Sequence, residues 1–237
     1  RIVDQLTPKV RMTPVKGKPA PELVRDQNTC FVPFVMEVQK SPDQRTYLEN
    51  GIIHIFTVGK YEKRKNLQMM IEVFEKLNSK YAVQLTIAGE CTSQAHQSIY
   101  QNLEKYIHEH EIDHVILCRN LSRPEMEQQY EKADLFVIPS TGEPASISQL
   151  EAMAYSIPVI CSDTNGTACY VVNDQNGYQF EDKNKESLQY CIEKFLKEPS
   201  KIKTMGKNAY EYLEQNCQFE NYFTGIMKCY DILCKKP

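Results

Sequence analysis

The chain has 237 residues, 41% of them hydrophobic and 25% charged, and its formal net charge is -3 at pH 7. These values are ordinary for one large or two small domains that bury a core. The near-neutral charge balance argues against a nucleic-acid-binding protein, and no apolar run approaches the roughly 18 residues that a membrane-spanning helix needs.

Residues 1–48 lack a regular hydrophobic period, because prolines such as Pro8, Pro14 and Pro33 interrupt it. The first 25 of these residues carry a local excess of basic side chains, which is compatible with contact to a membrane surface. We interpret 1–48 as a linker or as the tail of a missing amino-terminal domain. Because the sequence begins at Arg1 rather than at Met, we expect it to be a fragment of a longer protein.

From Gly51 onward, strand patterns alternate with helix patterns. Residues 52–59 form an apolar run that ends in glycine, and 66–80 repeat apolar residues at intervals of three and four, as an amphipathic helix does. Ser122 and Glu125 have the spacing of a helix capping box. Further strand-like runs cover 83–89, 114–118, 134–140, 157–162 and 177–181, and further helical patterns cover 96–110, 122–133, the segment around Glu151, 184–197, 200–216 and 219–236.

This alternation predicts an α/β fold, a doubly wound, Rossmann-like parallel sheet of about six strands with a helical carboxyl-terminal tail. We assign residues 49–215 to this domain and 216–237 to a final helix. With the strand order 3-2-1-4-5-6, the first and fourth strands are neighbours whose connections diverge. The ligand site is then expected in the crevice at their carboxyl ends.

Two unusual segments follow these two strands. The first strand ends at Gly59, and the cations Lys60, Arg64 and Lys65 come before the next helix. The fourth strand is followed by Glu143, by small residues at 145–148, and by the start of a helix. A helix start offers free backbone N–H groups and a favourable dipole to an anion. Cations on one lip and a helix start on the other indicate a diphosphate site.

Two glutamates bracket this predicted anion site. Glu151, about one turn into the helix, can accept hydrogen bonds from a ribose, whereas Glu143 can reach hydroxyl groups beyond the phosphates. Taken alone, the 60–66 segment reads as a solvated turn, and two glutamates eight positions apart occur by chance in most proteins. Their predicted places at the ends of neighbouring strands favour the binding site.

Other polar clusters carry less information. His108, His110 and His114 lack the spacing of a metal site, so we predict no metal. Asp163 and Asn165, after the fifth strand, could equally reach the crevice or cap a turn. Nine cysteines, an odd number without any Cys-x-x-Cys pair, indicate reduced core thiols in a cytoplasmic protein.

The segments VGKYEKRKNLQMMIEVFEKL, LTIAGE and EPASISQLEAMAYSIPVICSDTNG resemble the carboxyl-terminal donor-binding domain of glycosyltransferase family 4, which has the GT-B fold. The resemblance covers roughly residues 50–235 in the same order and spacing. It implies a retaining hexosyltransferase that moves a sugar from a nucleoside-diphosphate sugar, most simply a UDP-sugar or GDP-sugar, to an acceptor. Such enzymes use no separate cofactor and usually need no metal.

The resemblance also implies which residues bind the diphosphate. Lys60 and Lys65 would neutralise it next to Gly59, and Ser146 and Ile147 would offer backbone amides to the distal phosphate. Lys60 stands where the family more often has arginine, which keeps the charge but loses the two-pronged hydrogen bond.

The two organic ends of the donor would meet other residues. Glu143 would lie close to the transferred sugar, Glu151 at the ribose, and Asn120 and Leu121 near the base. Two departures from the family pattern stand out. EPAS replaces the more common EGFG, and Ser156 replaces a common glycine, where we expect an effect on local backbone geometry alone.

Family members build the whole enzyme from two Rossmann-like domains, and the last helix, here 216–237, crosses back to the first domain. The resemblance therefore implies that a glycan or lipid-linked acceptor binds through a missing amino-terminal domain. It further implies a cytoplasmic protein, in polysaccharide or glycolipid synthesis, with peripheral association at the inner membrane face. The present chain alone is then expected to bind donor without turnover. Alternatives are a glycogen or starch synthase, a sugar-nucleotide epimerase, or a non-catalytic nucleotide-binding module.

Overall fold

The computed structural model describes residues 32–234. These residues form a six-stranded sheet with the order β3-β2-β1-β4-β5-β6, and every neighbouring pair is parallel. The strand order confirms the predicted doubly wound, Rossmann-like α/β fold. The basic stretch within the first 25 residues lies outside the described part of the chain.

The elements lie close to their predicted positions. The strands are β1 (Ile53–Val58), β2 (Val83–Gly89), β3 (Val115–Arg119), β4 (Leu135–Ile138), β5 (Val159–Ser162) and β6 (Gly177–Phe180). The helices are α2 (Leu67–Asn78), α3 (Gln94–Glu109), α4 (Arg123–Lys132), α5 (Ile147–Ala154), α6 (Lys185–Lys197), α7 (Ser200–Asn216) and α8 (Phe219–Cys234). The predicted capping box forms at the start of α4, where the Glu125 carboxylate accepts a hydrogen bond from the backbone N–H of Ser122 at 2.7 Å.

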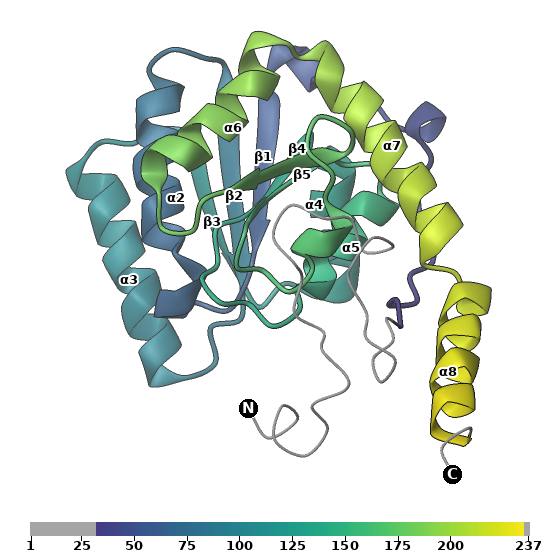
Figure 1. The fold of residues 1–237 in the computed structure, drawn as a ribbon. Helices are drawn as coiled ribbons and strands as arrows, with labels where there is room; N and C mark the ends of the chain where they lie inside the picture. Colours follow the sequence, from purple (N-terminus) through teal and green to yellow (C-terminus); the bar gives the residue numbers. More distant parts are fainter. Residues whose placement is uncertain (1–31, 235–237) are drawn as a thin grey trace.

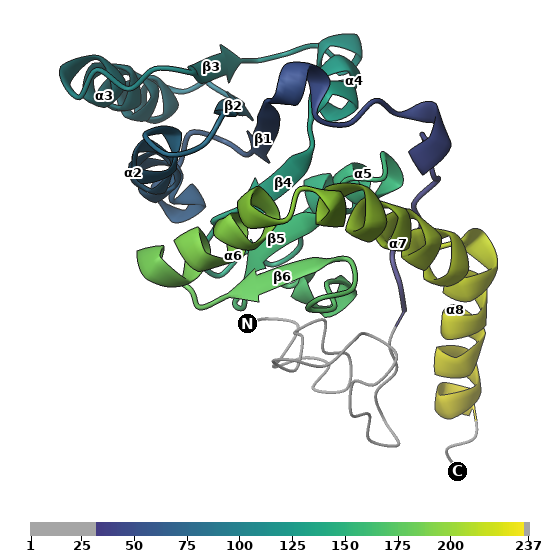
Figure 2. The same cartoon turned by 90° about the horizontal axis from the view of Figure 1, so that it is seen from above.

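Helices cover both faces of the sheet (Figures 1 and 2). Alternate side chains of each strand point to opposite faces, so Ile55 and Val137 belong to one apolar cluster while Phe56 and Phe136 belong to the other. The first cluster is completed by α2, α3 and α6, and the second by α4 and α5. Helix α7 contributes to both. Because both faces are buried, the strands read as continuous apolar runs.

The segment before β1 packs against the domain although it has little regular structure. The backbone N–H of Met36 donates to the carbonyl of Cys217 at 2.9 Å. The Arg45 guanidinium donates to the carbonyl of Tyr155 at 2.5 Å and also to that of Ala133. Residues 36–45 are therefore fastened across the ends of α4, α5 and α7.

The structure corrects the expectation for Ser156. Its φ of 57° is in the left-handed region, as expected where a glycine is common. However, the buried Ser156 hydroxyl also donates to the carbonyl of Lys40 at 2.6 Å, and its carbonyl accepts from the Tyr47 hydroxyl at 3.0 Å. The side chain thus helps to hold the segment before β1, an effect beyond local backbone geometry.

The expectation that all nine cysteines are reduced is wrong for Cys229, which is disulfide-bonded. Cys161, Cys191 and Cys217 are reduced and buried in the core as predicted. An odd cysteine count without Cys-x-x-Cys spacing does not exclude a single disulfide, so no local signal predicted this bond.

Helix α8 continues beyond α7 and points away from the sheet in both views (Figures 1 and 2). Several of its described apolar side chains are exposed to solvent, with Phe219 61% exposed and Phe223 53% exposed. Among the described residues, no helix combines the length and the hydropathy required to cross a membrane.

Candidate donor site

The segment after β1 is anchored in the core rather than left as a solvated turn. The Tyr61 side chain is fully buried, its hydroxyl donates to the carbonyl of Cys118 at 2.8 Å, and its ring meets Tyr100 edge to face at 5.0 Å. A short 3-10 turn, Lys63–Lys65, then leads into α2. The backbone that carries the charged residues on either side of Tyr61 is therefore held in one place.

The loops after β1 and β4 are bonded to each other, as the strand order predicts. The N–H of Thr141 donates to the carbonyl of Arg64 at 2.8 Å. The Asn66 side-chain amide donates to the carbonyl of Pro139 at 2.8 Å and to the Thr141 hydroxyl at 2.7 Å. The first strand's cations and the fourth strand's glutamate are thereby brought to one edge of the sheet.

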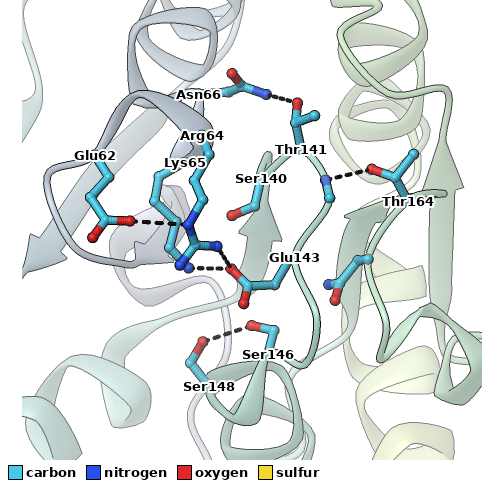
Figure 3. Close-up of polar contacts among 12 residues, drawn as sticks. Glu62, Arg64, Lys65, Asn66, Ser140, Thr141, Glu143, Ser146, Ser148 and Thr164 are labelled. Atoms are coloured by element: carbon cyan, nitrogen blue, oxygen red, sulfur yellow. Dashed lines mark hydrogen bonds and ion pairs between the residues drawn. The ribbon is translucent and has the colours of Figure 1, made fainter. Parts of the chain in front are cut away.

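The centre of this edge is a cluster of two cations around one carboxylate (Figure 3). Oε2 of Glu143 lies 2.5 Å from Nζ of Lys65 and 2.6 Å from Nη1 of Arg64. The side chains of Glu143 and Lys65 are only 7% and 11% exposed, whereas that of Arg64 is 43% exposed. The predicted pair Lys65 and Glu143 is thus in direct contact, with Arg64 as an additional member.

Backbone contacts fix the place of Glu143. Its carbonyl accepts a hydrogen bond from Gly166 N–H at 2.7 Å. A Cβ atom at Gly166 would lie 1.7 Å from the carbonyl oxygen of Pro144, so this close approach requires glycine. At the other side of the cluster, a Cβ atom at Gly59 would lie 3.0 Å from Cδ of Lys65. Gly59 therefore leaves room for the Lys65 chain across the end of β1.

The two cations decide the ionisation of Glu143. Burial by itself would raise the pKa of the carboxyl group, but the hydrogen bonds and charges of Lys65 and Arg64 outweigh it and lower the pKa below its ordinary value. Burial would likewise lower the pKa of Arg64, yet Glu143 and Glu62 raise it on balance. The cluster is therefore an ionised one, with more positive than negative charge at its centre.

The start of α5 lies directly beyond this cluster, with Ser146 as the residue before its first turn. The N–H of Ser146 donates to the Thr167 hydroxyl at 3.3 Å, and the Ser146 and Ser148 hydroxyls are 3.1 Å apart. Ile147, the first residue of the helix, is 41% exposed. The backbone amides predicted to bind a phosphate thus lie just after Glu143 in the chain. A ligand that accepts from the Ser146 N–H would have to replace its hydrogen bond to Thr167.

Glu151 lines a separate cavity of about 560 Å³ between α4 and α5. Its Oε2 accepts a hydrogen bond from the Tyr130 hydroxyl at 2.7 Å. Tyr130 is buried, and burial, followed by the nearby Glu151 charge, raises the pKa of its hydroxyl well above the ordinary value. The hydroxyl therefore acts as a hydrogen-bond donor that orients the carboxylate toward the cavity.

The remaining predicted residues line an adjoining cavity of about 440 Å³. Gly59, Lys60, Asn120 and Leu121 all belong to its wall, and Leu121 also lines the Glu151 cavity. Nζ of Lys60 lies 2.9 Å from Oε2 of Glu90, and hydrogen bonding to that carboxylate raises the Lys60 pKa. Lys60 is thus paired with the loop after β2 in this structure.

Asn120 is already engaged by its own fold. Its φ of 50° is in the left-handed region, and its side-chain oxygen accepts from the N–H of Cys91 at 2.8 Å. Leu121 has no such polar role and offers apolar surface to both cavities. Of the two residues predicted to lie near the base, Asn120 is therefore bonded to the β2–α3 loop, whereas Leu121 offers an apolar side chain to a ligand.

The sequence left the roles of Asp163 and Asn165 open, and the structure separates them. Asn165 is buried, and its amide oxygen accepts from the N–H of Thr167 at 3.1 Å, so it closes a turn. Asp163 Oδ1 accepts from the N–H of Asp182 at 3.1 Å. Among the histidines considered for metal binding, His110 stacks on Tyr106 with ring centroids 3.9 Å apart. Within residues 32–234, no three potential metal-binding side chains gather at one point.

Sequence reasoning missed Tyr130 as the partner of Glu151. It named Arg64 among the cations beside the predicted diphosphate site, but the family resemblance gave Arg64 no role. Tyr130 lies in a predicted helix without any motif, so no local signal identified it. The sequence did not predict the direct contact between Arg64 and Glu143, because nothing local specifies which cation before α2 faces that carboxylate.

Comparison with known proteins identifies the family of the chain. A family model described as glycosyl transferases group 1 matches residues 43–212, which is most of the chain. The chain belongs to this family. Membership in this family and the Rossmann-like sheet agree with the resemblance of the sequence to a glycosyltransferase domain of the GT-B fold.

Several glycosyltransferases and solved structures are similar to the chain. It is 25% identical over 207 residues to the capsular polysaccharide biosynthesis glycosyltransferase CapM of Staphylococcus aureus, a match that spans 87% of this chain and 53% of CapM. The carboxyl-terminal domain of the group 1 protein LpcC from Francisella tularensis aligns with a TM-score of 0.66 at 21% identity, over 79% of this chain and 97% of that domain. Anabaena HepE, solved in complex with UDP, aligns with a TM-score of 0.72 at 17% identity, over 90% of this chain and 59% of HepE.

The chain thus spans about half the length of the curated relatives it matches. Its match to nearly the whole LpcC domain shows which half has the same fold.

Proposed function

We propose that this chain is the donor-binding half of a family 4 glycosyltransferase, which transfers a hexose from a nucleoside-diphosphate sugar to an acceptor with retention of configuration. The observation that carries the proposal is the contact between Glu143 and Lys65, beside the start of α5 and at the carboxyl ends of β1 and β4. This is the crevice where doubly wound sheets bind ligands.

The proposed chemistry needs a site that stabilises a leaving diphosphate. When the bond between the anomeric carbon and the diphosphate breaks, negative charge develops on the phosphate oxygens. Lys65, Lys60 and the backbone amides of Ser146 and Ile147 would stabilise that charge as it forms. Glu143 would then contact hydroxyl groups of the transferred sugar.

The two adjoining cavities support a place for the nucleoside. Glu151, held by Tyr130, can accept hydrogen bonds from ribose hydroxyls, and Leu121 offers an apolar surface to the base. UDP is the first candidate, because HepE was solved with UDP; GDP is the alternative. In this proposal the protein needs neither a separate cofactor nor a metal.

The acceptor is assigned to another domain. The exposed apolar side of α8 is proposed to pack against an amino-terminal Rossmann-like domain that would bind a glycan or a lipid-linked acceptor. The proposal places the enzyme in the cytoplasm, with peripheral contact at the inner face of the membrane when the acceptor is a lipid, and in polysaccharide or glycolipid synthesis.

Calorimetric titration of UDP, GDP and ADP into the chain tests the donor site. We expect one nucleotide to bind, and we expect Lys65→Ala and Glu151→Ala each to weaken binding at least about tenfold, which is 1.4 kcal/mol. Glu186→Ala, at an exposed position in the first turn of α6, is the matched control and should leave affinity unchanged. Circular dichroism verifies that each variant is folded. If no nucleotide binds, or if all three variants bind equally well, the proposed function is wrong.

A further inference from the structure

Arg64 belongs to the cluster around Glu143, although the family resemblance gives it no role. Its Nη1 donates to Oε2 of Glu143 at 2.6 Å, and its Nε donates to Oε2 of Glu62 at 3.0 Å (Figure 3). These two bonds use two of the five N–H donors of a guanidinium group. With 43% of the side chain exposed, the group can also be reached from solvent.

The position of Arg64 is built into the loop. Its carbonyl accepts from the N–H of Thr141, which fixes its backbone to the loop after β4. Glu62, on the other side, holds the guanidinium through Nε, and His96 lies 3.6 Å from the second oxygen of the Glu62 carboxylate. The backbone contact and the Glu62 carboxylate together hold the Arg64 guanidinium beside Glu143. The neighbouring Lys63 is exposed.

A single carboxylate oxygen accepts hydrogen bonds from both cations. Oε2 of Glu143 accepts from Lys65 Nζ at 2.5 Å and from Arg64 Nη1 at 2.6 Å. A phosphate oxygen has the same charge-assisted hydrogen-bonding chemistry, and a diphosphate carries more charge than one carboxylate. The two cations thus converge on one point, with a hydrogen-bonding chemistry that also suits a phosphate oxygen.

We propose that Arg64 is a diphosphate-binding residue, and that the Glu143 carboxylate occupies the Arg64–Lys65 pair until the diphosphate of a donor replaces it. The inference rests on the proposed function and deepens it. In the exchange the two cations pass from a carboxylate to a phosphate, and the released Glu143 becomes available to the hydroxyls of the sugar. No covalent bond is made or broken.

The exchange has an uncommon consequence for ligand affinity. A nucleoside diphosphate without a sugar must compete with Glu143 for both cations and gains no contact from the released carboxylate. Removing the Glu143 charge should therefore strengthen the binding of a nucleoside diphosphate. If Glu143 were only a ligand contact, the same substitution would weaken binding or leave it unchanged.

The test measures the affinity of the full chain, by calorimetry, for whichever of UDP, GDP and ADP binds the wild-type protein most tightly. We expect Arg64→Gln to weaken binding at least about tenfold and Glu143→Gln to tighten it at least about threefold. Lys63→Gln is the matched control, because it removes the same charge from the same short turn. It should change affinity less than about twofold. Circular dichroism and the urea midpoint verify that all three variants are folded.

The outcomes separate this inference from the function beneath it. If Arg64→Gln weakens binding no more than Lys63→Gln does, the role of Arg64 is overturned. If Glu143→Gln binds more weakly than the wild type or equally well, the exchange is overturned. Both results leave the nucleotide site standing, since the wild-type chain still binds. Failure of all three nucleotides to bind the wild-type chain overturns the proposed function and this inference together.

Discussion

Glu143 shows how a buried carboxylate can remain charged. Its side chain is 7% exposed, and burial opposes ionisation, yet Lys65 and Arg64 hold the pKa below the ordinary value. Removing one member of such a cluster leaves the others without their opposite charge. The cluster is therefore expected to contribute to folding stability as well as to ligand binding.

Glu143→Gln should change the pH dependence of stability. Because the folded-state pKa of Glu143 is lowered, its stabilising contribution is present above the unfolded pKa of about 4.3 and is lost as the pH falls through the folded value. We expect the variant to be less stable than wild type by about 1–3 kcal/mol at pH 7, and this difference to shrink below about pH 4. Urea unfolding at a series of pH values measures both. A difference that stays constant down to about pH 3 would contradict this explanation.

The contact between α7 and the α5–β5 turn depends on a glycine. Gly206 lies within α7, and a Cβ atom there would be 2.2 Å from the carbonyl oxygen of Ser156. That oxygen belongs to a turn whose conformation is already constrained, since Ser156 has a positive φ and its side chain is bonded to Lys40. The turn has little freedom to move away from the helix.

Gly206→Ala should therefore destabilise the fold even though alanine favours a helix by about 1 kcal/mol over glycine. We expect a net loss of about 2 kcal/mol or more in the free energy of unfolding, because backbone atoms would have to move. Lys207→Ala, at the neighbouring exposed position of the same helix, is the control and should change stability by less than about 0.5 kcal/mol. Equal urea midpoints for the two variants would show that the helix can shift freely.

Apolar surface is unevenly distributed over the described part of the molecule. The sheet domain is closed on both faces, whereas α8 leaves the domain and exposes Phe219, Phe223, Ile226 and Tyr230. Apolar patches of this kind on a folded surface mark interaction sites. The chain spans about half of its curated relatives, which is consistent with the proposal that α8 packs against another domain.

A double substitution on α8, Phe223→Ser with Ile226→Ser, tests this surface. We expect the fluorescence of a hydrophobic dye bound to the native chain to fall by about half, because the substitution removes two apolar side chains from the patch. The free energy of unfolding should change by less than about 0.5 kcal/mol. Lys228→Ser on the same helix is the control for both measurements. Unchanged dye fluorescence, or a large loss of stability, would mean that these side chains are packed and not available.

The periodicity of the sequence predicted most of the fold, because it reports burial. Strands buried on both faces appear as short apolar runs, and helices buried on one side repeat at three and four, so both could be located without any distant contact. Chain connectivity then favours a single strand order, and that order places Gly59 and Glu143 at the same edge. Sequence reasoning accordingly predicted that the loops after β1 and β4 lie together, as the contact between Lys65 and Glu143 shows, whereas the role of these residues in ligand binding stays a prediction.

Pairings between distant residues were decided only by the tertiary structure. Arg64 and Lys65 meet Glu143 across 79 and 78 positions, and Ser156 meets Lys40 across 116. Hydrophobic periodicity is a local property and does not specify which polar side chain faces which. Those contacts are fixed once the packed sheet brings the ends of its strands, and the loops that follow them, into one place.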